Sequence, residues 1–206
     1  MQSKGILMVV SGFAGVGKGT VIKELLSTQS QYTLSVSATT RAPRPGEVDG
    51  VNYFFRTREE FEQMIHENGL IEHAEYVGNY YGTPKAYVEE QLNLGKNVIL
   101  EIEIQGAMNI KKQFPEAVLI FILPPDAKTL KERLVGRGTE TMEVIEKRMN
   151  RACQEAEGIE EYDYVVVNDE VPQCAMRIHE IIEAEKAKAK KNLSLIESIR
   201  NGLKNL

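Results

Sequence analysis

The chain contains Gly12-Phe13-Ala14-Gly15-Val16-Gly17-Lys18-Gly19-Thr20 between an apolar segment, Ile6 to Val10, and a segment that favours a helix, Val21 to Leu26. A strand, a glycine-rich turn and a helix in this order are the setting of a phosphate-binding P-loop. Glycines let backbone N–H groups point at a phosphate, and the helix N-terminus adds a favourable dipole. We predict nucleotide phosphate binding here, with Lys18 on the outer phosphates; the alternative is a glycine-rich turn with an incidental lysine.

Composition excludes several classes of protein. The chain has 206 residues and a formal net charge of -5, which argues against broad binding of nucleic acid. Cys153 and Cys174 lie far apart without metal-like spacing, so we expect free thiols in a reducing compartment. The first strand begins near Gly5, and no apolar run is long enough to span a membrane. We therefore expect a cytoplasmic protein with no membrane and no nucleic-acid partner.

Hydrophobic patterning predicts an α/β fold. Three apolar runs, Val98 to Leu100, Val118 to Leu123 and Val165 to Val167, have the composition of strands buried on both faces. Helical segments separate them, which predicts a parallel sheet covered by helices. The segment 35–94 differs, because its strands are short, closely spaced and hairpin-like. We interpret it as a smaller mixed α/β subdomain inserted into the core, with a helix that begins at the capping box Thr57 to Glu60.

Two helical segments, about 126–134 and 141–157, flank a basic hinge at Gly136-Arg137-Gly138. Such a hinge, far along the chain from the P-loop, predicts a moving lid. A last helix begins near Val171. After Lys191, apolar residues recur at helical spacing: Leu193, Ile196, Ile199 and Leu203. Two interpretations of this terminal helix remain open, packing on the chain's own core, which we expect, and an oligomer interface.

Arg41 and Arg44 lie close together on a stiff loop beside several hydroxyls, and Tyr53 follows. An arginine presents a planar fork of donors that fits phosphate oxygens. The alternative is a solvated loop whose arginines pair with Glu47 and Asp49. Because the P-loop already implies one bound phosphate, we favour the interpretation that these arginines form a second phosphate site.

Arg133, Arg137 and Arg148 form a third group. By itself this group favours a charged helix surface with partners such as Glu132 and Glu140. Beside two phosphate sites, an arginine lid is the better interpretation, since phosphoryl transfer between two anions needs positive charge on the moving oxygens.

Glu101 and Glu103 end an apolar strand, where P-loop proteins often carry an acidic residue near magnesium. A general acid/base pair and solvated strand-end charges are the alternatives. If the acceptor is a nucleoside monophosphate, its phosphate is already ionised near pH 7, so that positioning and charge neutralisation do most of the work.

These signals, in this order, resemble the guanylate kinase family, whose members pass a phosphoryl group from ATP to GMP. The resemblance covers Gly5 to about Glu185. Its further motifs are Ser35-Val36-Ser37, Gly50 to Tyr53, Gly78-Asn79-Tyr80-Tyr81-Gly82-Thr83, Ile104-Gln105-Gly106-Ala107, Gly136-Arg137-Gly138-Thr139-Glu140 and Val167-Asn168-Asp169.

The resemblance implies a set of site residues. For ATP it implies Gly12, Phe13, Ala14, Gly15, Val16, Gly17, Lys18, Gly19, Thr20, Arg133, Arg137 and, near adenine, Asn168. For the phosphate of GMP it implies Arg41, Arg44, Tyr53 and Tyr81; for guanine, Ser37, Glu72 and Thr83; and near GMP and magnesium, Glu101 and Glu103. The catalytic residues that it implies are Lys18, Arg41, Arg137 and Arg148.

The chemistry of Glu72 fits this role. Guanine presents N–H donors at N1 and N2, and one carboxylate accepts both. Adenine has an acceptor at N1, so the same carboxylate disfavours it, and a buried polar mismatch of this kind discriminates strongly.

This chain departs from the family pattern at two places. Glu101 and Glu103 stand where aspartates are usual, and the extra methylene shifts each carboxylate. Gly19 stands where a hydroxyl residue usually follows the lysine, with Thr20 one position later. We therefore expect the Mg²⁺ cofactor to be held mainly by phosphates and waters, with Thr20 contributing indirectly.

We predict a P-loop NTPase-type α/β core (about 5–34, 95–125 and 159–185), a GMP-binding insertion (about 35–94), a helical lid (about 126–158) and a C-terminal helical extension (186–206). The predicted reaction converts ATP and GMP, and also dGMP, to the diphosphates. The alternatives are a kinase for another nucleoside monophosphate and a non-catalytic guanylate kinase-like interaction module. Such modules characteristically lose the P-loop, which is present here.

Overall fold

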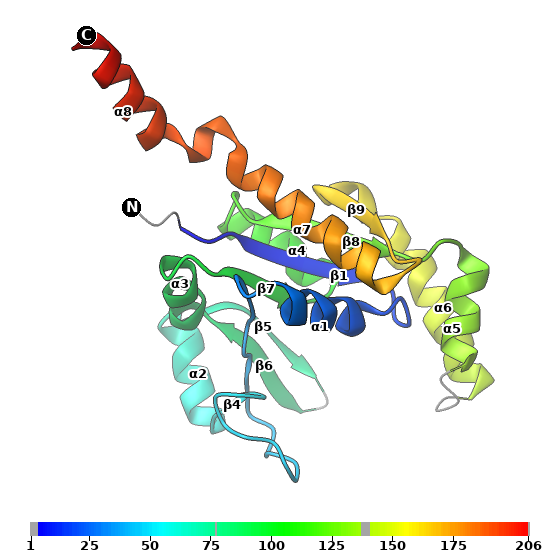
Figure 1. Cartoon of the computed structure of the whole chain (residues 1–206). Coiled ribbons are helices and arrows are strands. Elements are labelled where there is room, and N and C mark those ends of the chain that lie inside the picture. Colours follow the sequence, from blue (N-terminus) through cyan, green and yellow to red (C-terminus); the bar gives the residue numbers. More distant parts are fainter. Residues whose placement is uncertain (1–3, 77, 137–140, 206) are drawn as a thin grey trace.

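A five-stranded parallel sheet forms the centre of the computed structural model, which describes residues 4–76, 78–136 and 141–205 (Figure 1). The strands, in spatial order, are β2 (Tyr32–Leu34), β7 (Asn97–Glu101), β1 (Leu7–Gly12), β8 (Val118–Leu123) and β9 (Tyr164–Val167). Every pairing in this sheet is parallel. The predicted parallel sheet is confirmed.

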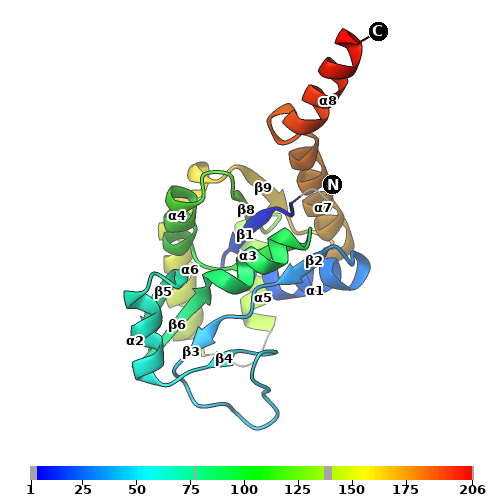
Figure 2. The ribbon, with the colours of Figure 1, turned by 90° about the vertical axis from the view of Figure 1, so that its left-hand side faces the viewer.

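Helices cover both faces of this sheet. The helices α1 (Lys18–Thr28) and α7 (Val171–Ala187) lie along one face, and α4 (Ile104–Gln113) lies along the other (Figure 2). α3 (Lys85–Asn93) leads into β7. The side chains of β1, β7 and β8 are almost wholly buried between these layers, which makes this sheet the core. Among the described residues, no helix is long and apolar enough to cross a membrane.

The last strand of the sheet corrects one expectation. Val165 and Val167 are 54% and 51% exposed, whereas Val166, which lies between them, is buried. The prediction of burial on both faces is therefore wrong for this run. β9 is an edge strand, and an apolar run does not reveal whether its strand lies at the edge or at the centre of a sheet.

A second, mixed sheet follows β2 in the chain. Its strands, in spatial order, are β4 (Phe54–Phe55), β3 (Ala38–Thr39), β6 (Asn79–Pro84) and β5 (Leu70–Tyr76). β2 belongs to the core sheet, β3 belongs to the small sheet, and residues 35–37 join them.

Helix α2 (Arg58–His66) packs on the small sheet through Phe61, whose ring stacks on Tyr80. The predicted capping box is confirmed. The Thr57 hydroxyl accepts a hydrogen bond from the Glu60 N–H at 3.1 Å, and the Glu60 carboxylate accepts one from the Thr57 N–H at 2.7 Å.

Helices α5 (Ala127–Gly136) and α6 (Met142–Ala156) stand together at the other side of the core from the small sheet (Figure 1). The Asp126 carboxylate accepts a hydrogen bond from the Thr129 N–H at 2.7 Å, which caps the start of α5. A short 3₁₀ helix, Ile159–Glu161, joins α6 to β9.

The C-terminal helix corrects a second expectation. A 3₁₀ helix, Ala189–Lys191, follows α7, and α8 (Leu193–Lys204) then projects away from the rest of the molecule (Figure 1, Figure 2). No residue of α8 is buried. The prediction that this helix packs on its own core is therefore wrong, because periodicity identifies an apolar face but not its partner.

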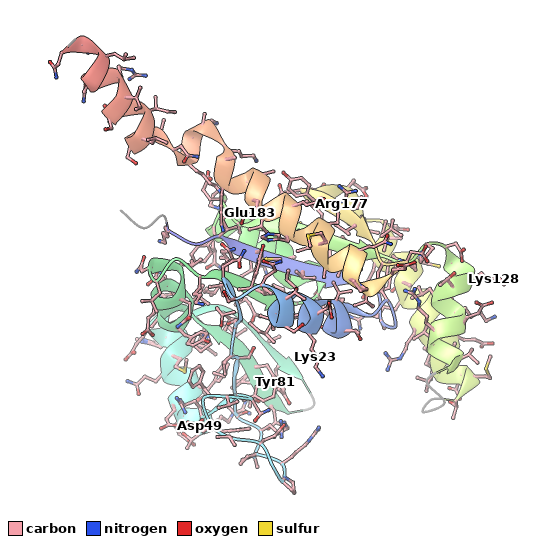
Figure 3. The ribbon with its side chains drawn as sticks, viewed as in Figure 1. Lys23, Asp49, Tyr81, Lys128, Arg177 and Glu183 are labelled. Atoms are coloured by element: carbon pink, nitrogen blue, oxygen red, sulfur yellow. The ribbon has the colours of Figure 1, made fainter. Side chains whose placement is uncertain are left out.

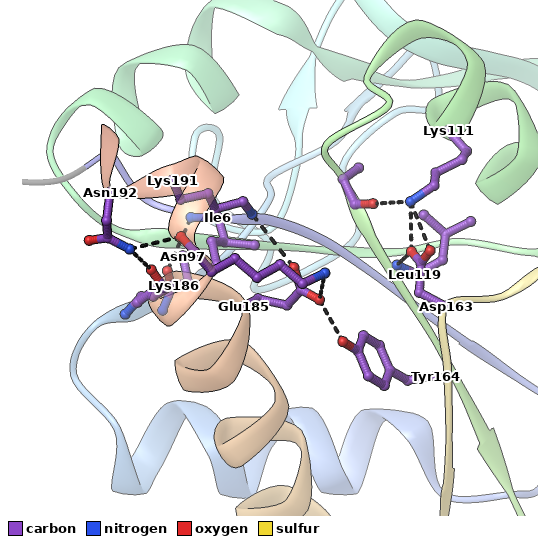
Figure 4. Close-up of polar contacts among 12 residues, drawn as sticks. Ile6, Asn97, Lys111, Leu119, Asp163, Tyr164, Glu185, Lys186, Lys191 and Asn192 are labelled. Atoms are coloured by element: carbon purple, nitrogen blue, oxygen red, sulfur yellow. Dashed lines mark hydrogen bonds and ion pairs between the residues drawn. The ribbon is translucent and has the colours of Figure 1, made fainter. Parts of the chain in front are cut away.

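The end of α7 is held by Glu185, whose side chain is only 5% exposed (Figure 4). Its carboxylate accepts a hydrogen bond from the Tyr164 hydroxyl at 2.5 Å and pairs with Lys188 at 2.5 Å and Lys191 at 3.8 Å. Burial works to raise the pKa of Glu185, but hydrogen bonds from Lys188 and Tyr164 outweigh it and leave the pKa lowered.

We expect Glu185→Ala to lower the free energy of unfolding by about 1–3 kcal/mol, because it removes hydrogen bonds to a buried charge. Glu183→Ala is the matched control on the same helix; it removes an exposed ion pair with Lys186 and should cost less than about 1 kcal/mol. A lowered pKa stabilises the fold above the ordinary carboxyl pKa, and this is lost as the pH falls through the lowered value. Urea unfolding at several pH values measures both effects; equal losses for the two variants would contradict the role of Glu185.

Candidate functional site

The glycine-rich loop lies at the carboxyl end of β1 and leads directly into α1. Gly15 and Gly17 adopt φ values of 87° and 94°, in the region that side chains disfavour. Gly17 is the N-cap residue of α1, so the first N–H groups of this helix border the loop. The Lys18 ammonium donates a hydrogen bond to the Gly12 carbonyl at 2.6 Å, which folds this side chain back over the loop.

Close neighbours leave no room for side chains at three of the loop glycines. A Cβ atom on Gly12 would lie 2.6 Å from the Ile122 carbonyl oxygen. One on Gly15 would lie 2.7 Å from the Leu134 side chain, and one on Gly17 would lie 2.7 Å from the Asn168 amide nitrogen. Gly19 differs, since a Cβ atom there would meet nothing within 4 Å. The departure from the usual motif at Gly19 is therefore not imposed by protein packing.

The carbonyl of Val16 ties this loop to two distant segments. It accepts hydrogen bonds from the Asn168 amide at 2.8 Å and from the Arg133 guanidinium at 3.4 Å. Arg133 also donates to the Asn168 carbonyl at 2.9 Å and to the Asp169 carbonyl at 3.5 Å. Asn168 is buried, and its Oδ1 atom has no hydrogen-bond partner in the described part of the chain. Arg133 and Asn168, which are both among the residues predicted for ATP, thus hold the loop in place through hydrogen bonds.

A second site opens between the two sheets. A cavity of about 180 Å³ is lined by Leu34, Ser35, Ser37, Asn52, Tyr53, Thr83, Leu100, Glu101 and Ile102. Four residues predicted for GMP are therefore brought together here from four separate parts of the chain: Ser37, Tyr53, Thr83 and Glu101. The lining thus combines hydroxyls and one carboxylate with the apolar side chains of two leucines and Ile102.

Glu72 adjoins this cavity through Thr83. The Thr83 hydroxyl, which is buried, donates a hydrogen bond to Glu72 Oε1 at 2.8 Å. Burial raises the pKa of the Glu72 carboxyl, while the hydrogen bond from Thr83 works to lower it. A carboxylate partly removed from water in this way is stabilised by further N–H donors.

Arg41 is held against the small sheet. Its guanidinium pairs with Glu47 at 2.9 Å and lies over the rings of Tyr53 and Phe55, at 5.4 and 5.8 Å from their centroids. The hydrogen bond to Glu47 raises the pKa of Arg41, and the same bond lowers the pKa of Glu47. The Tyr81 ring lies 6.1 Å from Tyr53 and comes from β6, in the small sheet (Figure 3).

Arg44 and Asp49, the other charged residues of this loop, have different partners. The Arg44 N–H donates a hydrogen bond to the Glu47 carboxylate at 2.7 Å. Asp49 pairs with Arg56, at 3.4 Å. The alternative suggested by the sequence pairs the loop arginines with Glu47 and Asp49. The ion pair between Arg41 and Glu47 agrees with it, whereas Asp49 pairs with Arg56.

Two of the remaining predicted residues lie apart from the small cavity. Glu103 precedes α4 and pairs with Arg151 of α6, which also bonds Glu155 at 2.9 Å. Arg148 lies one turn before Arg151, also on α6 and only partly exposed. Arg137, the third lid arginine, lies outside the described residues.

Comparisons with known proteins agree on a family. The family model described as guanylate kinase matches residues 4–185. A guanylate kinase of Streptococcus pneumoniae serotype 4 is 57% identical over 186 residues, which are 90% of this chain and 89% of that relative. One of Halalkalibacterium halodurans is 58% identical over 187 residues, 91% of this chain and 92% of the relative. This chain belongs to the guanylate kinase family.

A solved structure supports the same assignment. The crystal structure of guanylate kinase from Anaplasma phagocytophilum matches with a TM-score of 0.71 and 35% identity, over 95% of this chain and 94% of that one. Membership of the guanylate kinase family confirms the predicted class of enzyme, a nucleotide kinase. It does not favour the alternatives of another nucleoside monophosphate kinase or a non-catalytic module.

The family pattern did not single out Ser35 for a role of its own. Its hydroxyl lines the small cavity, is buried, and has no hydrogen-bond partner in the described part of the chain. The bend between β2 and β3 brings this side chain to the cavity. The sequence offered one signal, a short hydroxyl run that includes Ser37, but not which hydroxyls face inward.

We expect Gly17→Ala to weaken ATP binding by about tenfold or more, because a side chain in the left-handed conformation costs about 1–2 kcal/mol and here also displaces Asn168. Gly19→Ala is the matched control, since its Cβ atom meets open space, and it should bind ATP as the wild type does. Isothermal titration with ATP measures both. Equal affinities in the two variants would show that the loop conformation does not govern binding.

Proposed function

We propose that this chain transfers the γ-phosphoryl group of ATP to the phosphate of GMP, with ADP and GDP as products. The observation that carries this proposal is a P-loop on the core sheet together with a polar cavity beside the small sheet, which Glu72 adjoins through Thr83. We propose that the segments 35–94 and 126–158 move as a GMP-binding insertion and a lid on the core. The cytoplasmic location stays a prediction.

On the ATP side, the loop Gly12 to Thr20 binds the phosphates with its N–H groups and the start of α1. Lys18 leaves the Gly12 carbonyl and contacts the outer phosphates, which present a stronger acceptor than a peptide oxygen. Arg133 and Asn168 keep the loop in shape through Val16. The Oδ1 atom of Asn168, which has no hydrogen-bond partner among the described residues, is an acceptor for an amino group such as that of adenine.

On the GMP side, the partly buried Glu72 carboxylate accepts the N1 and N2 hydrogens of guanine, while Ser37 and Thr83 supply hydroxyls. Arg41 exchanges Glu47 for the GMP phosphate, and Arg44, Tyr53 and Tyr81 supply further donors. The exchange is favourable because a phosphate carries more charge than the carboxylate that it replaces.

At the point of transfer, Arg137 and Arg148 neutralise charge on the moving phosphoryl oxygens when the lid closes, and Lys18 and Arg41 do so from the donor and acceptor sides. Closure also excludes water, which would otherwise compete as the acceptor. Glu101 borders the GMP cavity directly, whereas Glu103 takes part only if it leaves Arg151.

The residues present fit a magnesium ion that is held mainly by its substrate. Among the described residues, no group of three or more His, Cys, Asp or Glu side chains is placed to hold a metal. Mg²⁺ commonly keeps several waters and is bound through substrate phosphates, where it neutralises their charge. The Thr20 hydroxyl, exposed in the first turn of α1, is the protein group we propose to act through a water.

The reaction is tested with purified protein, Mg-ATP and each of GMP, dGMP, AMP, UMP and CMP, by following ADP release. We expect turnover with GMP and dGMP alone. Preferred turnover of AMP or a pyrimidine nucleotide would overturn the guanine assignment. Absence of turnover with every acceptor would indicate a non-catalytic module.

We expect Glu72→Gln to lower kcat/KM for GMP by about a hundredfold, because the amide group places a donor against the N–H groups of guanine. The KM for ATP should stay unchanged. Glu75→Gln is the matched control, since Glu75 is exposed on the same strand. Steady-state kinetics with GMP and ATP varied separately decides the matter, and wild-type use of GMP by Glu72→Gln would remove Glu72 from this role.

We expect Gly19→Ser to lower the Mg²⁺ concentration needed for half-maximal activity several-fold, because it adds a hydroxyl where the usual motif has one. The space around Gly19 accepts the side chain without displacing protein atoms. Gly19→Ala, which adds a side chain but no hydroxyl, should need as much Mg²⁺ as the wild type. If both variants respond to Mg²⁺ alike, a hydroxyl at this position does not hold the metal.

A further inference from the structure

Glu47 is bonded to both of the arginines that are proposed to bind the phosphate of GMP. Its Oε1 atom accepts a hydrogen bond from the Arg41 guanidinium at 2.9 Å. Its Oε2 atom accepts one from the main-chain N–H of Arg44 at 2.7 Å. The proposed reaction uses the two arginines but gives no role to the carboxylate that joins them.

A tight turn brings Glu47 back to Arg44. The Glu47 N–H donates a hydrogen bond to the Arg44 carbonyl at 3.0 Å, and Gly46 has a φ of 87°. Pro45 and Gly46 occupy the two central positions, and proline followed by a glycine of positive φ is typical of a type II turn. Because proline fixes its own φ, the local sequence favours this turn before any ligand arrives.

The Arg41 side chain is held in one orientation by the groups around it. Its guanidinium also donates a hydrogen bond to the Ala42 carbonyl at 2.7 Å and lies over the rings of Tyr53 and Phe55. Only 17% of the Arg41 side chain and 20% of the Glu47 side chain are exposed. A long side chain that is free in water loses rotamer freedom when a ligand orders it, and this opposes binding. The ion pair with Glu47 orders Arg41 in advance.

Glu47 carries its negative charge at neutral pH. The hydrogen bond from Arg41 lowers the pKa of the Glu47 carboxyl most, and the hydrogen bond from the Arg44 N–H lowers it further. The charges of both arginines act in the same direction. The carboxylate is therefore a stable anchor for the two donors.

Asp49 provides a comparison within the same loop. Its carboxylate also accepts a hydrogen bond from a main-chain N–H, that of Phe55, at 2.7 Å, and also pairs with an arginine, Arg56, at 3.4 Å. The Asp49 side chain is 60% exposed. Asp49 thus resembles Glu47 in chemistry but is bonded to residues outside the proposed phosphate site.

We propose that Glu47 is a positioning residue for the acceptor phosphate, which holds Arg41 and the main chain of Arg44 so that the loop 41–47 binds this phosphate with little reordering. When the phosphate replaces Oε1 on Arg41, Oε2 keeps the Arg44 N–H and continues to hold the loop. Preorganisation of this kind raises affinity without a new contact to the ligand. The inference rests on the proposed function, since it takes the phosphate of GMP as the ligand of Arg41.

The test is isothermal titration of the full chain with GMP and with guanosine, which has the same base and sugar but no phosphate. We expect Glu47→Gln, which removes the charge and keeps the shape, to raise the Kd of GMP about tenfold, because ordering one long side chain costs about that much affinity. The Kd of guanosine and the Kd of ATP should stay as in the wild type, which also shows that the variant is folded. Asp49→Asn, the matched control, should bind GMP as the wild type does.

A second arm of the experiment asks whether Glu47 acts through Arg41. In an Arg41→Ala background, the further change Glu47→Gln should weaken GMP binding less than it does in the wild type, because the shared contact is already gone. Equal losses in the two backgrounds would show that Glu47 does not act through this arginine, and would overturn the proposal.

Two other results would overturn it. GMP binding by Glu47→Gln as tight as in the wild type, or tighter, would leave Glu47 only as an internal competitor for Arg41. Equal weakening of GMP and guanosine would indicate a general disturbance of the site, since a positioning role is confined to the phosphate. A wild type that binds ATP but neither GMP nor guanosine would instead contradict the proposed function, so the two failures are distinguishable.

Discussion

The carbonyl of Val16 is the contact on which the nucleotide site depends. Asn168, after β9, and Arg133, on α5, both donate hydrogen bonds to it, so three segments far apart in the chain meet at one oxygen atom. The left-handed conformation of Gly17 turns the loop into α1 beside this contact. Side chains on Gly15 or Gly17 would strike Leu134 or Asn168, so loop shape and packing determine each other.

The same contact connects the phosphate-binding loop to the mobile part of the proposed mechanism. α5 carries both Leu134, which packs on Gly15, and Arg133, which binds Val16. A movement of α5 would therefore change the contacts that hold the loop in its conformation. Arg151 forms a second connection, since it joins α6 to Glu103 after β7. This ion pair is exposed, so it is weak enough to exchange during a conformational change.

The acceptor cavity depends on a different constraint, the passage of the chain between two sheets. Residues 35–37 leave the core sheet after β2 and enter the small sheet at β3, and this places Ser35 and Ser37 beside Thr83 and Glu101. The cavity thus has walls from both sheets. A change in the relative position of the two sheets would therefore alter the size of the cavity.

The local sequence by itself determined the P-loop, the capping box at Thr57 and the strands of the parallel core, because glycine conformation, cap hydrogen bonds and apolar runs act over a few residues. Family resemblance added the candidate residues for guanine and phosphate. Only the tertiary structure decided that Val165 and Val167 are exposed, that Glu103 contacts Arg151, that Ser35 faces the cavity and that α8 leaves the core. These outcomes depend on which segments meet across long sequence separations, and a local pattern specifies a face of a helix or strand without specifying what covers it.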